Sequence, residues 1–123
     1  MKKVIIKTGS EEEFFKRGRK VARLADQGKP IPEERIISFE DPVEVGRIMT
    51  AARLAVFRAV KEAPGSITGI AERLRRDRSA VKRDVDELEK AGLVAVETAI
   101  SPGHGQRKEV TVTAKRFKLE AYL

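Results

Sequence analysis

The sequence contains no cysteine, no tryptophan and no asparagine, and its single histidine is His104. Without cysteine the chain can form no disulfide, no thiolate zinc site and no thiol nucleophile, and the lone histidine has no partner at a spacing typical of metal binding or catalysis. We therefore expect no metal, no cofactor and no enzymatic activity. The interior has to be held together by packing.

Long apolar runs are also scarce. The run nearest the amino terminus covers only residues 4–6, whereas a membrane-spanning helix needs about 20 apolar residues. We expect neither a secretory signal nor a transmembrane segment, and we expect the protein in the cytoplasm. Charged residues make up 37% of the chain, and this share, together with the lack of asparagine, is more typical of thermophiles.

Acidic residues are the minority among the charges. The chain has 26 Lys and Arg against 19 Asp and Glu, a formal net charge of +7, which favours a polyanionic partner without specifying which one. With 123 residues, the chain is long enough for one compact domain and too short for a catalytic domain beside a separate binding domain.

The amino-terminal third predicts a strand, a helix and a second extended segment. Residues 2–7 are rich in β-branched side chains and favour a short strand. Ser10 and the three glutamates after it form a capping box for a helix that should end near Gly28. Residues 35–39 can form another strand or an extended linker, and Asp41 then caps a short helix that starts with a proline.

Three closely connected helices are predicted next. The first starts at Thr50 and stops before a Pro-Gly pair. Ser66 caps the second, whose apolar side chains recur at i, i+3, i+4 and i+7, one face of about two helical turns. Asp77 caps the third, which ends in a glycine cap at Gly92 and has its buried stripe at Val81, Val85 and Leu88. Helices in this order, joined by short turns, indicate a helix-turn-helix.

A β-hairpin follows the third helix directly. Residues 93–100 and 109–113 favour two strands, and the glycine-rich segment 101–106 favours a turn between them. Such a hairpin is the wing of a winged helix-turn-helix. The predicted fold is α+β, with an N-terminal extension at residues 1–41, the winged domain at residues 42–113 and a C-terminal strand at residues 114–123. The pairing partner of that last strand is open.

Residues 66–94, SITGIAERLRRDRSAVKRDVDELEKAGLV, resemble the MarR-like winged helix-turn-helix transcriptional regulators. With ISFEDP at residues 37–42, the chain looks more narrowly like a group of small DNA-binding proteins of archaea and bacteria, some of them described as antitoxin-like. The resemblance implies that the helix at about residues 78–91 enters the major groove and that the wing at residues 94–113 touches flanking backbone. Arg75 departs from the pattern, because such families often carry a glycine there. It must accept a left-handed conformation at a cost of about 1 kcal/mol or reshape the turn.

Basic side chains gather around this turn and the start of the third helix. Six lie within residues 73–83, opposed only by Asp77, which is the expected helix cap. With the buried stripe facing the core, Ser79 and Arg83 point most directly outward. Arg83 is the leading candidate to read a base, since an arginine can bind guanine O6 and N7 together, which discriminates by about 1–3 kcal/mol. The predicted DNA-contacting residues, wing included, are Ser66, Thr68, Arg75, Arg76, Arg78, Ser79, Lys82, Arg83, His104, Gln106, Arg107 and Lys108.

Alternatives stay open at these residues. The basic helix face can be merely solvated, with Lys82–Asp86 and Arg83–Glu87 as i, i+4 ion pairs, and the wing can be a solvated hairpin. A winged helix can also serve as an adaptor or antitoxin-like subunit that binds an acidic or toxin-like protein partner. RNA is disfavoured, because one tyrosine and five phenylalanines offer no cluster of exposed aromatics for stacking bases.

A single winged helix reads only a short half-site of double-stranded DNA. Regulators of this size therefore commonly dimerise and bind two half-sites about one helical turn apart, and we expect a homodimer. The segments outside the winged domain, residues 1–41 and 114–123, are the candidates for its interface. Alternatively, they complete the sheet and core of a single chain.

Overall fold

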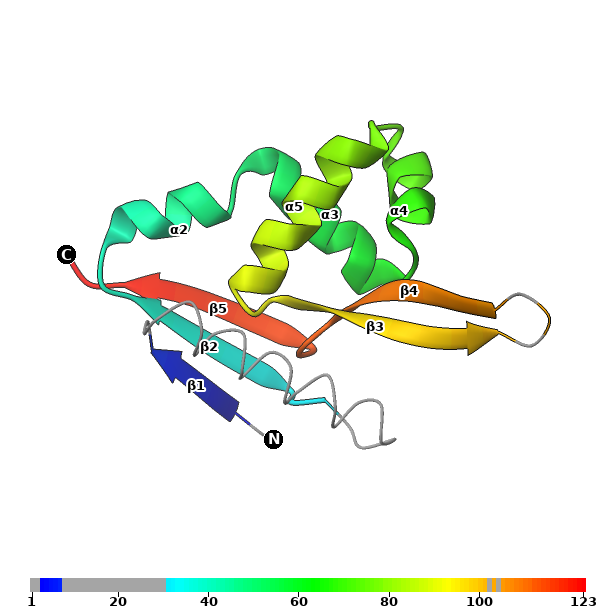
Figure 1. The fold of residues 1–123 in the computed structure, drawn as a ribbon. Helices are drawn as coiled ribbons and strands as arrows, with labels where there is room; N and C mark the ends of the chain where they lie inside the picture. The colour runs from blue at the N-terminus through cyan, green and yellow to red at the C-terminus, as the bar shows by residue number, and fades with distance from the viewer. Residues whose placement is uncertain (1–2, 8–30, 102, 104) are drawn as a thin grey trace.

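The computed structural model describes residues 3–7, 31–101, 103 and 105–123. The helix predicted from Ser10 and the predicted contact His104 lie outside these residues. A sheet, a layer of helices and a projecting hairpin make up the described part (Figure 1). The elements are β1 (Lys3–Lys7), β2 (Glu34–Phe39), α2 (Pro42–Ile48), α3 (Ala51–Glu62), α4 (Ile67–Leu74), α5 (Arg78–Lys90), β3 (Val94–Ser101), β4 (Gly105–Val112) and β5 (Arg116–Ala121).

The three-stranded sheet has the order β1-β2-β5, and both strand pairs are parallel. The segment predicted as a strand or a linker is therefore its central strand. The C-terminal strand finds its partner in β2, where Ile37 lies opposite Leu119. Parallel neighbours need a long crossover, and between β2 and β5 the helices α2 to α5 and the hairpin supply it. Both terminal strands complete the sheet of a single chain, and the homodimer stays a prediction.

The helices begin where the sequence predicts, at the predicted caps Asp41, Ser66 and Asp77 and at the predicted start Thr50, which is also an N-cap. Each of these side chains accepts a hydrogen bond from a backbone N–H of the following turn, at distances of 3.0 to 3.2 Å. These bonds satisfy amides that the first helical turn leaves without partners. At the end of α4, Arg75 has φ 53° and ψ 46°. Of the two alternatives for this position, Arg75 therefore adopts the left-handed conformation in which a glycine is common.

The core lies between the helices and one face of the sheet. The predicted stripe of α5 is fully buried, which confirms its helical spacing. Phe57 of α3 packs edge-on against Phe117 of β5, with ring centroids 5.3 Å apart. This contact joins the helical layer to the C-terminal strand. The buried side chains of α5 are Val81, Val85 and Leu88.

The wing is an antiparallel hairpin of β3 and β4, from Val94 opposite Val112 to Ser101 opposite Gly105. Gly103 and Gly105 at its tip have φ of 82° and 72°, a conformation that side chains disfavour. The hairpin extends away from the helical layer (Figure 1). Together with α3, α4 and α5 it forms a winged helix-turn-helix, and the fold is α+β, as predicted.

Arg35 connects the sheet to the winged domain. Its side chain is fully buried, and its Nη1 donates to the Gly92 carbonyl and to Thr113 Oγ1, both at 2.5 Å. Gly92 follows α5 and Thr113 follows β4, so one side chain of β2 holds both ends of the segment that forms the wing. A Cβ at position 92, where φ is 82°, would lie 3.3 Å from the guanidinium, which explains the glycine.

Candidate nucleic-acid interface

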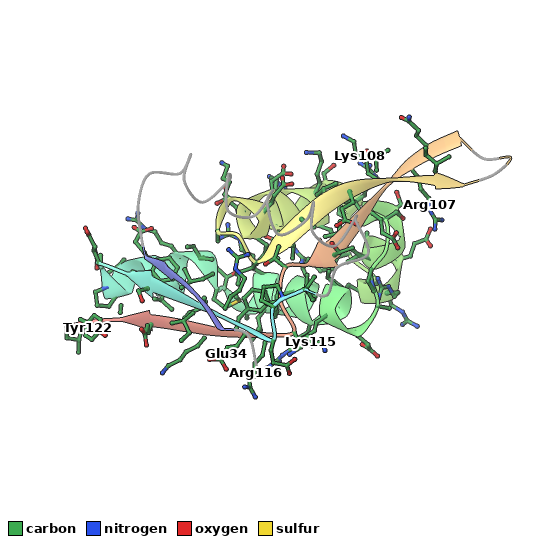
Figure 2. The ribbon with its side chains drawn as sticks, turned by 90° about the horizontal axis from the view of Figure 1, so that it is seen from below. Glu34, Arg107, Lys108, Lys115, Arg116 and Tyr122 are labelled. Atoms are coloured by element: carbon green, nitrogen blue, oxygen red, sulfur yellow. The ribbon has the colours of Figure 1, made fainter. Side chains whose placement is uncertain are left out.

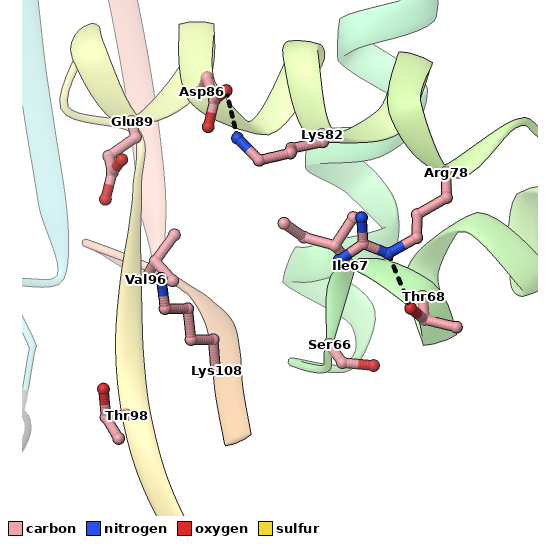
Figure 3. Close-up of a pocket in the computed structure, with 10 residues that line it drawn as sticks. All are labelled: Ser66, Ile67, Thr68, Arg78, Lys82, Asp86, Glu89, Val96, Thr98 and Lys108. Carbon is pink, nitrogen blue, oxygen red and sulfur yellow. Dashed lines mark hydrogen bonds and ion pairs between the residues drawn. The ribbon is translucent and has the colours of Figure 1, made fainter. Parts of the chain in front are cut away.

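A groove of 540 Å³ lies between α5 and the wing (Figure 3). The start of α4, one face of α5 and both strands of the hairpin line it. Five of the predicted contacts meet here, from three separate segments of the sequence. The lining residues are Ser66, Ile67, Thr68, Arg78, Lys82, Asp86, Glu89, Val96, Thr98 and Lys108.

Three exposed cations converge on this groove, Arg78 and Lys82 from α5 and Lys108 from β4. The Nε of Arg78 donates to Thr68 Oγ1 at 3.0 Å, which holds the guanidinium beside the start of α4 (Figure 3). Lys82 Nζ lies 2.9 Å from Asp86 Oδ2. An exposed pair of this kind contributes little to stability, so the ammonium group can turn to a phosphate at small cost.

Local geometry explains which side chains reach the groove. Positions four apart on a helix share a face, so Arg78, Lys82 and Asp86 form one row along α5. Successive side chains of a strand point to opposite faces, so Lys108 faces the groove while Arg107 points away from it (Figure 2). Thr98, directly opposite Lys108 in the hairpin, lines the same groove.

Arg83, the predicted base reader, lies outside this groove. It is exposed and lines a second hollow of 430 Å³, together with Arg53 of α3 and the C-terminal half of α5. The i, i+4 pair considered for it is not formed, because Glu87 Oε1 lies 3.7 Å from Lys90 Nζ instead. Within the described part of the chain, the Arg83 guanidinium has no ion-pair partner.

Two arginines of the basic run have structural partners. Arg76 Nη1 lies 2.9 Å from Asp84 Oδ2 and 3.4 Å from the Ala52 carbonyl, and Arg73 donates to two carbonyls at the end of α3. These contacts join the turn and α4 to α3. Part of the basic run therefore has partners within the protein, which the sequence alone does not reveal. A DNA contact by Arg76 stays a prediction, and its side chain is only 29% exposed.

The remaining predicted contacts are exposed at separate places. Ser79 lies at the start of α5, Arg75 in the turn, and Gln106 and Arg107 on β4. Ser66, which lines the groove, is half-buried, and its hydroxyl caps α4. In the part of the chain that the structure describes, no cluster of His, Asp and Glu side chains can hold a metal ion, and no helix is long and apolar enough to cross a membrane.

Residues 48–119 match the family model HVO_A0114. This segment includes the three helices of the winged domain, the wing and most of β5. It makes up more than half of the chain. The chain belongs to the HVO_A0114 family. The match contains the whole groove between α5 and the wing.

Two solved structures are similar to this HVO_A0114 protein. One is a possible transcriptional regulator from Methanosarcina mazei Go1, which is 20% identical in sequence and has a TM-score of 0.49. The similarity covers 61% of this chain and 68% of that regulator. The second is a MarR-like transcriptional regulator from Thermotoga maritima, which is 27% identical in sequence and has a TM-score of 0.48. The similarity covers 88% of this chain and 67% of that regulator. No curated protein matches the chain. The antitoxin-like part of the sequence resemblance stays a prediction.

Sequence reasoning did not place Glu89 in the groove of this HVO_A0114 protein. Its carboxylate lines the groove, and burial raises its pKa because the charged form loses hydration. A backbone hydrogen bond from Val96 and the nearby Lys108 and Lys82 act in the opposite direction, while Asp86 adds to the rise. The spacing of Glu89 could have predicted this position. Glu89 lies seven residues after Lys82, and residues seven apart lie on the same face of a helix.

Proposed function

We propose that this protein is a sequence-specific double-stranded DNA-binding transcriptional regulator, in which α5 enters the major groove and the wing lies on the flanking backbone. One observation carries the proposal: Arg78, Lys82 and Lys108 converge on the groove between α5 and the wing. Phosphates supply most of the affinity of such complexes. A groove with cations on both walls suits a DNA backbone strand.

The distribution of charge along α5 favours one orientation. Its first half carries Arg78, Lys82 and Arg83, whereas Asp86 and Glu89 lie toward its C-terminus. The N-terminus of a helix also attracts anions through its free N–H groups and its dipole. We therefore orient α5 with its N-terminal end deepest in the DNA.

In this arrangement, the outward-pointing side chains of α5 read the bases. Arg83 is exposed and lacks an ion-pair partner within the described residues, so its guanidinium can meet a guanine edge. Ser79 can serve a base or a phosphate. Arg75, Gln106 and Arg107 approach flanking backbone, and Arg76 supports the turn through Asp84.

The test is fluorescence anisotropy of a labelled duplex of about 30 base pairs from the protein's own promoter, with a scrambled duplex as control, across about 50 to 200 mM salt. We expect both duplexes to bind with a steep salt dependence and the promoter to bind more tightly. Lys108→Ala should weaken both alike and reduce the salt slope by about one. Lys115→Ala is the matched control, because this exposed lysine lies near the sheet and apart from the groove (Figure 2).

Arg83→Ala tests the assignment of base reading. It should reduce the preference for the promoter over the scrambled duplex, by about 1–3 kcal/mol at one operator position. Equal losses on both duplexes would remove Arg83 from that role. If neither duplex binds wild-type protein at about 50 mM salt, the cations do not serve DNA, and the interpretation as an adaptor for an acidic protein takes its place.

A further inference from the structure

We propose that the outer edge of β5 is a self-association surface. Two copies of the chain pair their β5 strands antiparallel about a two-fold axis at Leu119, and their two sheets become one. The use of this dimer rests on the proposed function, since two winged domains related by a two-fold axis can occupy two half-sites of DNA. The interface itself involves β5 alone and does not depend on DNA binding.

β5 forms one margin of the sheet. Among the described strands it pairs only with β2, on one side, and it runs along the rim of the molecule in Figure 2. The N–H and C=O groups along such an edge are a ready template for a further strand. A second β5 satisfies them without changing the fold of either chain.

The side chains of β5 alternate between two environments. On one face lie opposite charges two residues apart: Lys118 Nζ is 3.5 Å from Glu120 Oε2. The hydroxyl of Ser38 also donates to Glu120, at 3.1 Å, which holds this carboxylate in place. The other face packs on the core and remains half-buried, with Phe117, Leu119 and Ala121.

Charge selects one register for the pairing. Residues directly opposite each other in an antiparallel pair lie on the same face and interact. With the axis at Leu119, Lys118 of each copy faces Glu120 of the other. With the axis one position earlier or later, Lys118 or Glu120 would face its own counterpart, and like charges directly opposite destabilise a sheet.

The same register gives a partner to an exposed aromatic side chain. Tyr122 is 78% exposed just beyond the end of β5. With the axis at Leu119 it stands opposite Arg116 of the second copy, an arrangement in which a guanidinium can stack on the ring. Leu119 of one copy meets Leu119 of the other, so a half-buried apolar side chain loses further contact with water.

Charge reversal in the full chain tests the interface. Lys118→Glu creates two like-charge pairs across the dimer, and so does Glu120→Lys. By analytical ultracentrifugation, we expect a wild-type dimer and a dissociation constant raised roughly tenfold or more in each variant. Lys61→Glu, at an exposed position on α3, is the control and should leave the wild-type dissociation constant unchanged.

An equimolar mixture of the two reversed variants should recover the wild-type dissociation constant. In the heterodimer, every side chain at position 118 again faces an opposite charge at position 120 of the other copy. Loss of the Lys118–Glu120 pair within one chain cannot explain recovery, because neither chain regains that pair on mixing. Continued weak association of the mixture would count against the interface.

The lack of native cysteine allows a direct test of the register. Lys118→Cys mixed with Glu120→Cys should yield a disulfide-linked dimer under mild oxidation, because opposite Cα atoms lie about 4.5–5.5 Å apart in antiparallel pairs, within disulfide reach. Neither variant alone should cross-link. Cross-linking of Lys118→Cys or Glu120→Cys with itself would overturn the register.

Failure of this inference and failure of the proposed function are distinguishable. A wild-type chain that sediments as a monomer at the concentrations at which it binds the promoter duplex would overturn the β5 interface and leave DNA binding intact. A dimer that obeys the charge-reversal and cross-linking expectations but binds no duplex would leave the interface intact and remove its proposed use. Circular dichroism of each variant checks that it folds.

Discussion

Glu89 places a carboxylate in a groove that also contains Arg78, Lys82 and Lys108. Burial, aided by Asp86, raises its pKa above the usual value for glutamate. Because this pKa is higher in the folded chain than in the unfolded one, the folded state binds the proton more tightly. Protonation of Glu89 therefore stabilises the folded chain. This stabilisation is fully present below the pKa that Glu89 has in the unfolded chain, and it is lost as the pH rises through the pKa that Glu89 has in the folded chain. The ionised form of this carboxylate would repel a DNA phosphate.

We expect Glu89→Gln to strengthen binding of the promoter duplex about two- to fivefold near neutral pH, because it removes a negative charge from the groove. Wild-type affinity should rise as the pH falls from neutral toward the raised pKa, and the variant should lack this part of the rise. Anisotropy titrations at fixed salt measure both. Glu62→Gln, at the exposed end of α3, is the control for removing a carboxylate elsewhere.

Histidine is the side-chain type whose ordinary pKa lies closest to neutral pH, and the sequence contains one, His104. Both wild type and the Glu89→Gln variant retain it, so the difference between their pH profiles isolates Glu89. The charged groups that act on Glu89 are Asp86 and Lys82 of α5 itself and Lys108 of β4 across the groove. Identical pH profiles for the two proteins would show that this carboxylate does not meet the DNA.

The turn between α4 and α5 combines an unusual backbone conformation with an exposed charge. Arg75 ends α4 in the left-handed conformation, and the N–H of Arg76 bonds to the Ala71 carbonyl at 3.0 Å. Asp77 then caps α5. Glycine is the common residue at such a helix end. An arginine there brings a cation to the C-terminal end of a helix dipole and an exposed charge to the turn.

Replacing Arg75 by glycine should stabilise the fold, because glycine adopts this conformation without strain. We expect a gain of about 1 kcal/mol, or roughly 3–5 °C in Tm, measured by thermal circular dichroism. Arg75→Ala is the matched control, since it removes the same charge but keeps a Cβ at positive φ. A similar rise in Tm for both variants would mean that charge, not backbone strain, is responsible.

At the scale of the whole molecule, one buried network joins the sheet to the wing. Thr113 Oγ1 accepts from Arg35 Nη1 and lies 2.6 Å from the Gly92 carbonyl, to which it can donate. Thr113 is 1% exposed. The angle at which the wing leaves the domain therefore depends on contacts between β2, the end of α5 and the end of β4.

Thr113→Val should lower the free energy of unfolding by about 2 kcal/mol, because it leaves a buried charged donor with one partner fewer while keeping the side-chain volume. Urea denaturation measures the change. Thr111→Val, two positions earlier on β4, is the matched control. Its hydroxyl is part-buried and lies 3.4 Å from Glu97 Oε1, so a change within about 0.5 kcal/mol is expected. Equal effects of the two variants would contradict a role for the buried network.

Among the described residues, the sequence by itself determined the helices from Asp41 onward, their starts and the presence of the hairpin, although β4 begins at Gly105 and not at residue 109 as predicted. Ser66, Asp77 and the stripe of Val81, Val85 and Leu88 act over one or two helical turns, so their spacing along the chain suffices to predict them. The glycines of the wing tip act over a similar range. The basic residues of the groove were predicted for the same reason, since helical and strand periodicity tell which side chains point outward.

Only the tertiary structure decided the pairing of β2 with β5 and the partners of individual charges. Four helices and the hairpin separate those strands in the sequence, and no local pattern specifies which strand another will meet. Arg76 finds Asp84, Arg83 lies outside the groove, and Glu89 lies inside it. A side chain's charge can be read from the sequence, but its burial and its partners follow from packing between distant segments, and these decide whether the charge is available to DNA.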